Sequence, residues 1–147
     1  MRQSLTRRLP YRPEQLFALV GDVERYPEFV RWVTALTTWN RKTDETGLTT
    51  FDAQARVRFA IVHERFSTRV TLNAPALAID VALISGPFKR LENHWRFSAD
   101  GEGTIVSFDI DFAFSSRILE KILAANMDHA ASRLMVCFEA RAATMYG

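Results

Sequence analysis

Glu64 is the residue whose type fits its place in the sequence pattern least well. It falls on the same strand face as Val62, Phe66 and Val70, so alternation turns its carboxyl group toward an apolar interior. A buried carboxyl group is costly unless it is paired or protonated. Inside a pocket it would serve as an acid/base group or, if protonated, donate a hydrogen bond to a ligand carbonyl such as that of a quinone. The alternative is that Glu64, close to the start of its strand, reaches solvent.

Asn93 presents the same choice on a later strand. It shares a face with Leu91, Trp95 and Phe97, and its amide would donate a hydrogen bond to a ligand oxygen, as the few polar groups of an apolar pocket do. The alternative is a residue at the end of the sheet that the backbone satisfies. Asn126, on the inner stripe of the C-terminal helix, carries the same two alternatives.

Other motifs of catalysis or metal binding are missing from the sequence. His63 and His94 fall on the outward strand face and His129 lies off the inner helix stripe, without the spacing of a metal site. Neither a nucleophile elbow nor a phosphate-binding glycine loop occurs. Cys137 is the only cysteine, which excludes an intramolecular disulfide and a cysteine-based zinc site. With no convergent acid/base pair, we expect no catalytic residue, no metal and no cofactor, and hence a protein that is not an enzyme.

The first thirty residues predict a strand and two short helices. Leu5–Leu9 is the candidate strand. Pro13 suits the first turn of a helix because its missing N–H would be unpaired there, and Gly21 ends that helix. Pro27 disfavours helical geometry at Tyr26, so the second helix must be very short.

The middle of the chain predicts six strands joined by turns. Phe51–Phe59 alternates apolar and polar residues with a period of two. The parity then flips by one residue at Ala60–Ile61, which indicates a tight turn or bulge. Asp100–Gly103 is typical of a hairpin turn. The predicted strands cover Val33–Asn40, Phe51–Phe59, Val62–Leu72, Ile79–Leu83, Leu91–Phe97 and Val106–Phe114.

The period becomes helical at Ser115. An apolar stripe runs from Leu119 to Phe138, and no Pro or Gly occurs before Gly147, which predicts one continuous helix of about 30 residues and about 45 Å. Half-buried strands require an antiparallel sheet with a covered apolar face, and only this helix is large enough to cover it. We therefore predict an α+β fold with a curved antiparallel sheet of about seven strands around the long C-terminal helix. Because a curved sheet does not close perfectly on one helix, we also predict a cavity between them.

Composition places few further limits. The 147 residues, 48% hydrophobic and 24% charged, fit a single domain spanning 1–147. The net charge of +2 arises from 16 Arg and 3 Lys against 17 acidic residues, and it does not indicate nucleic-acid binding. The basic stretch Met1–Arg8 lacks a following apolar segment, and no uncharged run approaches the roughly 20 residues of a membrane span. We expect a cytoplasmic protein, with a peripheral position at the inner face of the membrane as the alternative.

Three segments carry a resemblance to a known family: Tyr26–Trp32, Phe66–Val70, and Gly86–Leu91 with the following Trp95-Arg96-Phe97. Over nearly its whole length the chain resembles the START-like, helix-grip superfamily, and within it the coenzyme-Q-binding family. The resemblance implies ubiquinone bound in a hydrophobic tunnel, in support of respiration. It also extends to polyketide cyclases and dehydrases and to a bacterial ribosome-association toxin. Mitochondrial relatives carry a presequence that is missing here, which suggests a bacterial member.

The resemblance and the residue pattern together predict a carrier or chaperone for ubiquinone (coenzyme Q) or a similar isoprenoid lipid, supporting respiratory electron transport, with the quinone a bound ligand and not a redox cofactor. The alternatives are a polyketide cyclase/dehydrase-type enzyme with Glu64 as acid/base, and a ribosome-associating growth regulator. The residues predicted to line the cavity are Phe17, Tyr26, Phe29, Val57, Phe59, Glu64, Phe66, Val70, Asn93, Trp95, Phe97, Phe108, Ile110, Met127 and Leu134.

The arginines predicted to face outward are compatible with more than one kind of binding partner. They form a solvated face in the simplest interpretation. The same cations would contact anionic lipid headgroups, or ribosomal phosphates under the alternative function. These residues are Arg7, Arg8, Arg12, Arg56, Arg58, Arg65 and Arg69. The oligomeric state is not determined by these patterns.

Overall fold

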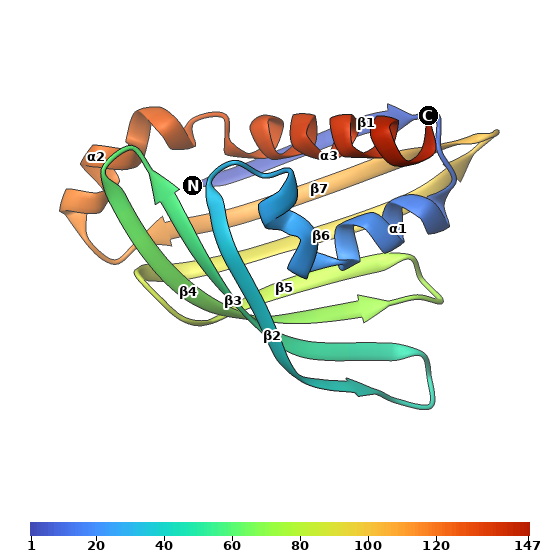
Figure 1. Ribbon diagram of the computed structural model, residues 1–147, viewed down its shortest axis with the longest axis horizontal. Helices are drawn as coiled ribbons and strands as arrows, with labels where there is room; N and C mark the ends of the chain where they lie inside the picture. The colour runs from blue at the N-terminus through green and yellow to red at the C-terminus, as the bar shows by residue number, and fades with distance from the viewer.

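The computed structural model contains one antiparallel sheet of seven strands, in the order β1-β7-β6-β5-β4-β3-β2 (Figure 1). It describes the backbone of residues 1–147 and every side chain except that of Asn126, so the prediction for that side chain lies outside the described residues. The predicted α+β arrangement is confirmed. The elements are β1 (Arg2–Leu9), α1 (Pro13–Gly21), η1 (Val23–Glu28), β2 (Val33–Thr43), β3 (Leu48–Phe59), β4 (Val62–Asn73), β5 (Ala78–Ser85), β6 (Phe88–Asp100), β7 (Gly103–Phe114), α2 (Arg117–Met127) and α3 (Ala130–Tyr146).

The two short helices after β1 begin and end where the sequence predicts. Pro13 occupies the first position of α1, and the Gln15 side chain accepts a hydrogen bond from the Arg12 backbone N–H at 3.0 Å. The second helix is a 3-10 helix of six residues that contains Pro27. Both helices lie between β1 and β2 in sequence and pack inside the curve of the sheet (Figure 1).

Irregularities in β2 bend the sheet. Its pairing with β3 shifts register between Val33 and Ala35 and again between Trp39 and Lys42. Asn40, inside the second shift, has a φ of 57°, and its side-chain amide donates to the Asp52 carboxylate at 3.1 Å. A bulge inserts an extra residue into one strand and bends it, so this end of the sheet curls toward the helices.

The parity flip at residues 60–61 is a two-residue turn. Phe59 pairs with Val62 across the turn, and Ala60 has a φ of 54°. The hairpin places Val57 directly opposite Glu64. Both residues therefore stand on the same, concave face of the sheet.

The C-terminal helical segment is interrupted at Asp128 and His129, and the prediction of one continuous helix is wrong at this point. The sequence gives no local sign of the break, since neither Pro nor Gly lies near it. The Gln3 side chain on β1 bridges the end of α2 and the start of α3. Its Nε2 donates to the Met127 carbonyl at 2.7 Å, and its Oε1 accepts from the Ala131 N–H at 2.9 Å. The side chain thereby satisfies the last turn of α2 and the first turn of α3, which have no helical partners of their own.

The core consists of three packed clusters. The largest joins α1 and α3 to the middle of the sheet around Phe51, Phe108 and Phe138. A second lies beneath α2 around Phe112, and a third lies beneath η1 and β2 around Val30. Several side chains belong to two clusters at once, so the clusters border a common space.

The Gln3 contacts predict a specific stability effect. Replacing Gln3 with Met keeps the length of the side chain but leaves the Met127 carbonyl and the Ala131 N–H without their partner, so the free energy of unfolding should fall by about 1–2 kcal/mol. Urea denaturation measures this loss, with Gln54→Met on β3 as the control. Equal midpoints for the two variants would show that Gln3 does not stabilise the break.

Candidate functional site

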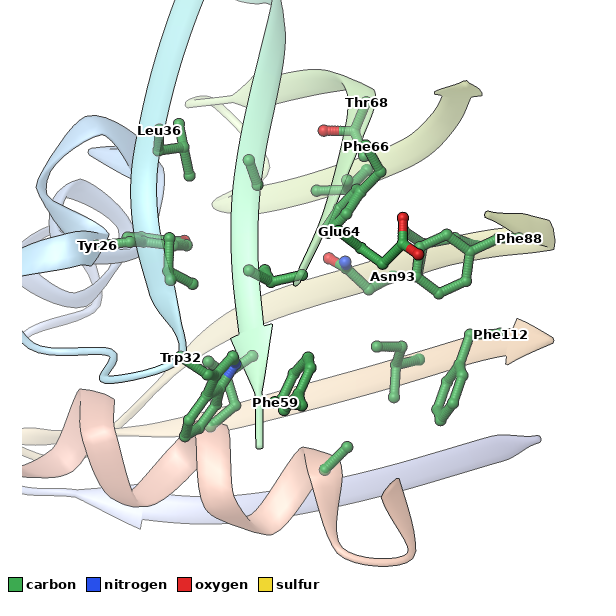
Figure 2. Close-up of a pocket in the computed structure, with 18 of the residues that line it drawn as sticks. Tyr26, Trp32, Leu36, Phe59, Glu64, Phe66, Thr68, Phe88, Asn93 and Phe112 are labelled. Carbon is green, nitrogen blue, oxygen red and sulfur yellow. The ribbon is translucent and has the colours of Figure 1, made fainter. Parts of the chain in front are cut away.

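A cavity of about 430 Å³ lies between the concave face of the sheet and the two C-terminal helices (Figure 2). Ligand pockets usually measure about 300–1,000 Å³ and are mostly apolar, as this one is. Most of the side chains predicted to face a cavity do line it. They are Tyr26, Val57, Phe59, Glu64, Phe66, Val70, Asn93, Trp95, Phe108, Ile110, Met127 and Leu134.

Small side chains in the middle of β3 account for the empty space. The concave face of this strand carries large rings at both ends, Phe51 and Phe59, but only the smaller side chains of Ala53, Ala55 and Val57 between them. Across the hairpin these alanines stand opposite Thr68 and Phe66. Because the walls on either side are fixed in packed clusters, they cannot collapse into the space that the two methyl groups leave.

Three residues that were predicted to line the cavity lie outside its lining: Phe17, Phe29 and Phe97. Phe17 on α1 packs edge-on against Phe97 with ring centroids 6.2 Å apart, and Phe29 packs against Phe138 at 5.3 Å. These rings fill the part of the concave face that α1 and η1 cover. Helix and strand parity correctly turned Phe17 and Phe97 inward, but parity does not tell a filled interior from an empty one.

Several lining residues were not predicted. Phe112 and Phe114 share the strand parity of Ile110, so the alternation along β7 also predicts that they face inward. Leu36 belongs to the irregular β2, where no clean alternation exists, and Trp32 lies in the turn just before this strand. The other unpredicted side chains of the lining include Val20, Val23, Val33, Ile79, Val81, Phe88, Leu91 and Leu123.

The Gly-Pro-Phe segment between β5 and β6 builds one wall of the cavity. Gly86 has a φ of 147°, and a Cβ atom there would stand 2.5 Å from the Cβ of Phe66, so only glycine fits. This close approach lets Phe88 pack against Phe66, with ring centroids 5.3 Å apart, and against Phe114 at 5.0 Å.

Polar side chains of the lining come from β4 and β6, the two strands that flank β5 in the sheet. Glu64 and Thr68 project from β4 and Asn93 from β6, and Figure 2 shows Glu64 and Asn93 facing the same part of the cavity, beside Phe88. Asn93 Oδ1 is buried and has no hydrogen-bond partner among the described residues. Glu64 is half-buried, so both of its predicted environments are combined: it lines the cavity and is also in part exposed to solvent.

Tyr26 also lines the cavity and has a titratable hydroxyl, but this hydroxyl already makes a hydrogen bond within the protein. Its hydroxyl donates to the Val20 carbonyl, and burial raises the pKa of the phenol, with the Asp22 carboxylate adding to the effect. A phenol held in this way is not available as an acid or a base. Glu64 is the one carboxylic acid of the lining within the described part of the chain, and Tyr26 does not add a second acid or base.

The exposed lining residues mark where the cavity opens. Arg58 and Ala60 lie beside the β3–β4 turn and Arg133 lies on the first turn of α3. An apolar side chain stands beside this opening on the outside, because Ile61, next to Ala60 in the turn, is 87% exposed. The opening is thus bordered by both cations and apolar surface.

The outward arginines divide into paired and unpaired groups. Arg8 contacts Asp100 at 2.8 Å and Arg69 contacts Asp52 at 3.0 Å. Arg56 and Arg65, however, stand directly opposite one another on the outer face of the β3–β4 hairpin, and neither makes an ion pair with any described residue. Arg58 is next to them and equally without an ion pair. We call Arg56, Arg58 and Arg65 the basic hairpin patch.

The histidines and the cysteine add no further site. His94 lies on the outer face, as predicted, with its Nδ1 2.6 Å from the Asp80 carboxylate. Among the described residues no group of His, Cys, Asp and Glu side chains has the arrangement of a metal site. Burial raises the pKa of the Cys137 thiol, although the Arg31 charge opposes this, so the thiol is a poor nucleophile.

The sequence matches the family described as polyketide cyclase / dehydrase and lipid transport over residues 9–139. The chain belongs to this family. A family that joins enzymes and lipid carriers fits a cavity of this kind, because both need an enclosed apolar space for a ligand. The comparison by itself assigns no catalytic activity to this member.

Two kinds of curated relative share this family's sequence. The ribosome association toxin RatA of Rickettsia prowazekii is 33% identical over 141 residues, which covers 93% of this chain and 92% of that protein. The mitochondrial coenzyme Q-binding protein coq10 of Schizosaccharomyces pombe is 31% identical over 117 residues, which covers 77% of this chain and 69% of that protein.

Solved structures agree on the fold. The 18 kDa protein CC1736 of Caulobacter crescentus is 51% identical, with a TM-score of 0.81 and coverage of 100% of this chain and 99% of that one. The Zhui aromatase/cyclase of Streptomyces sp. R1128 has a TM-score of 0.80 at 13% identity, over 97% and 93% of the two chains. A START superfamily protein of Mycobacterium smegmatis has a TM-score of 0.76 at 20% identity, over 98% of each chain. The predicted START-like, helix-grip fold of this polyketide cyclase/dehydrase family member is confirmed.

A matched pair of substitutions tests whether the space is real. Val70 and Val106 are each 2% exposed, but only Val70 borders the cavity. Val106→Phe should overpack the core and lower the free energy of unfolding by about 1–3 kcal/mol, whereas Val70→Phe should cost clearly less because its ring enters empty space. Urea midpoints compare the two variants. Equal losses would mean that the protein in solution has no cavity beside Val70.

Proposed function

We propose that this polyketide cyclase/dehydrase family member binds ubiquinone or a similar isoprenoid lipid in the cavity and acts as a carrier or chaperone for it. The observation that carries the proposal is a preformed apolar cavity with a small group of polar atoms on one wall. Apolar surface removed from water contributes about 25 cal/mol per Å², which is the main source of affinity for such a lipid. The relative coq10, named as a coenzyme Q-binding protein, supports the same ligand class.

A binding role fits the lining better than a cyclase or dehydrase reaction. Acid/base catalysis by two groups needs a pair in which one donates and the other accepts a proton. In the described lining, Glu64 is the one carboxylic acid and the Tyr26 hydroxyl is bonded to the Val20 carbonyl. The name of the family and the structural likeness to Zhui support an enzyme only as the second interpretation.

The size of the cavity indicates how the ligand is held. A volume of about 430 Å³ suits a drug-sized molecule. A quinone headgroup with the first part of its tail fits this space, while a long polyprenyl tail must lie partly outside it. Ile61 beside the opening, and Ile118 and Ile122 on α2, are exposed and offer apolar surface on which the outer part of the tail can lie.

The same surface supports a transient contact with the bilayer from which the ligand comes. Arg117 and Lys121 lie on α2 beside Ile118 and Ile122, so apolar and cationic side chains occur together on this helix. Cations near an anionic leaflet contribute about 1 kcal/mol each. In the described part of the chain, none of the helices combines the length and hydrophobicity that crossing a bilayer requires. The contact would therefore be peripheral.

Ligand binding is tested with a short-tail ubiquinone and tryptophan fluorescence. Trp32 and Trp95 line the cavity, so a saturable change in their emission is expected. The affinity should change little between low and high salt, because buried apolar contacts are not screened. Val70→Phe should weaken binding about tenfold or more by occupying ligand space, whereas Val106→Phe should not. A steep loss of affinity with salt, or no saturable change, would contradict the proposal.

Ribosome association is the second candidate, and the basic hairpin patch is the observation that favours it. Like charges opposite one another on neighbouring strands destabilise a sheet, and Arg56 and Arg65 are such a pair. An anionic partner such as ribosomal RNA would relieve this repulsion. The relatives named as ribosome association toxins, including RatA of Rickettsia prowazekii, support this partner.

Cosedimentation separates the ribosome from the membrane as the partner of the patch. If the patch binds ribosomal phosphates, the double variant Arg56→Gln/Arg65→Gln should bind ribosomes about tenfold or more weakly and show a shallower salt dependence. Arg8→Gln/Arg69→Gln removes the same charge from ion-paired positions and should have less effect. Binding to anionic vesicles but not to ribosomes would assign the patch to lipid and reject ribosome association.

A further inference from the structure

The polar wall of the cavity is rich in hydrogen-bond acceptors. The side-chain oxygens of Glu64 accept hydrogen bonds, and a carboxylate group has no donor. Asn93 Oδ1 is a second acceptor, buried and without a partner among the described residues. Thr68, 6% exposed, contributes a hydroxyl that both donates and accepts. A buried acceptor without a donor costs free energy, so a ligand that brings donors gains more here than one that does not.

The two redox forms of a quinone differ in this property. The oxidised form presents carbonyl oxygens, which only accept hydrogen bonds. They can pair with the Asn93 amide N–H or the Thr68 hydroxyl, but they leave the oxygens of Glu64 and Asn93 Oδ1 without a donor. The reduced form, a hydroquinone, presents two hydroxyl groups that donate. Phe66 and Phe88, packed edge to face with centroids 5.3 Å apart, border the same wall and offer aromatic contacts to the ring of either form.

We infer that the cavity prefers lipids whose aromatic head donates hydrogen bonds, and therefore holds the hydroquinone form more tightly than the quinone. Glu64 and Asn93 are the selecting residues, and Thr68 completes the polar wall. The inference rests on the proposed function, since it assigns the redox state of a ligand bound in that same cavity. A carrier of this kind would deliver reduced quinone to a reaction that oxidises it, or collect it from a reaction that reduces quinone.

The experiment compares the two forms of one decyl-tailed ubiquinone under anaerobic conditions. Dissociation constants are measured from the emission of Trp32 and Trp95. The hydroquinone should bind about tenfold or more tightly than the quinone. Its hydroxyl groups donate to the acceptor oxygens of the wall, whereas the quinone has no donor and leaves those oxygens unpaired. The midpoint potential of the bound quinone should then rise by about 30 mV for each tenfold preference. Equal affinities, or tighter binding of the quinone, would overturn the inference and leave the proposed function standing.

Variants test whether the preference for hydroquinone comes from the polar wall of the cavity. Glu64→Gln keeps the shape of the side chain and adds a donor, so it should weaken hydroquinone binding, strengthen quinone binding and reduce the ratio of the two to near one. Glu92→Gln, on the exposed outer face of β6, is the control and should leave the ratio unchanged. A ratio unchanged in Glu64→Gln would refute the role of Glu64 in selection. Failure of the wild-type protein to bind either form would overturn the proposed function together with the inference.

Discussion

The concave apolar face of the sheet has to be covered, and one straight helix does not follow its curvature. The C-terminal segment solves this by changing direction between Met127 and Ala130, where Gln3 of β1 supplies the hydrogen bonds that the helix ends lack. α3 then covers the middle of the sheet and α2 covers the ends of β6 and β7. The space between these two contacts and the hairpin of β3 and β4 is the cavity.

The cavity is held open by rigid walls and not by a polar interior. Aromatic contacts such as Trp95 with Phe108, at 4.1 Å, and Phe88 with Phe114 fix the surrounding side chains in place. Ala53 and Ala55 are too small to fill the centre. An apolar space of this kind favours an apolar ligand, and the few polar atoms of Glu64 and neighbouring residues decide its orientation and chemistry.

The opening and the basic hairpin patch lie on the same part of the molecule, because both are built on the β3–β4 hairpin. Arg58 belongs to the patch on one side and to the lining on the other. A partner that covers the patch would therefore also stand near the opening. The interior and the outer surface of this one hairpin therefore offer different chemistry.

Local patterns in the sequence determined the strands, the parity flip at Ala60–Ile61 and the inward direction of Glu64, because alternation and turn chemistry depend on neighbouring residues alone. Only the tertiary structure decided which inward residues border empty space, so that Val70 lines the cavity while Phe97 fills the core. The helix break was equally hidden, since its cause, Gln3, lies more than a hundred residues away in sequence. Contacts of this range, like the gathering of Asn93 and Glu64 from separate strands on one wall, arise when the sheet curls, and no local period encodes them.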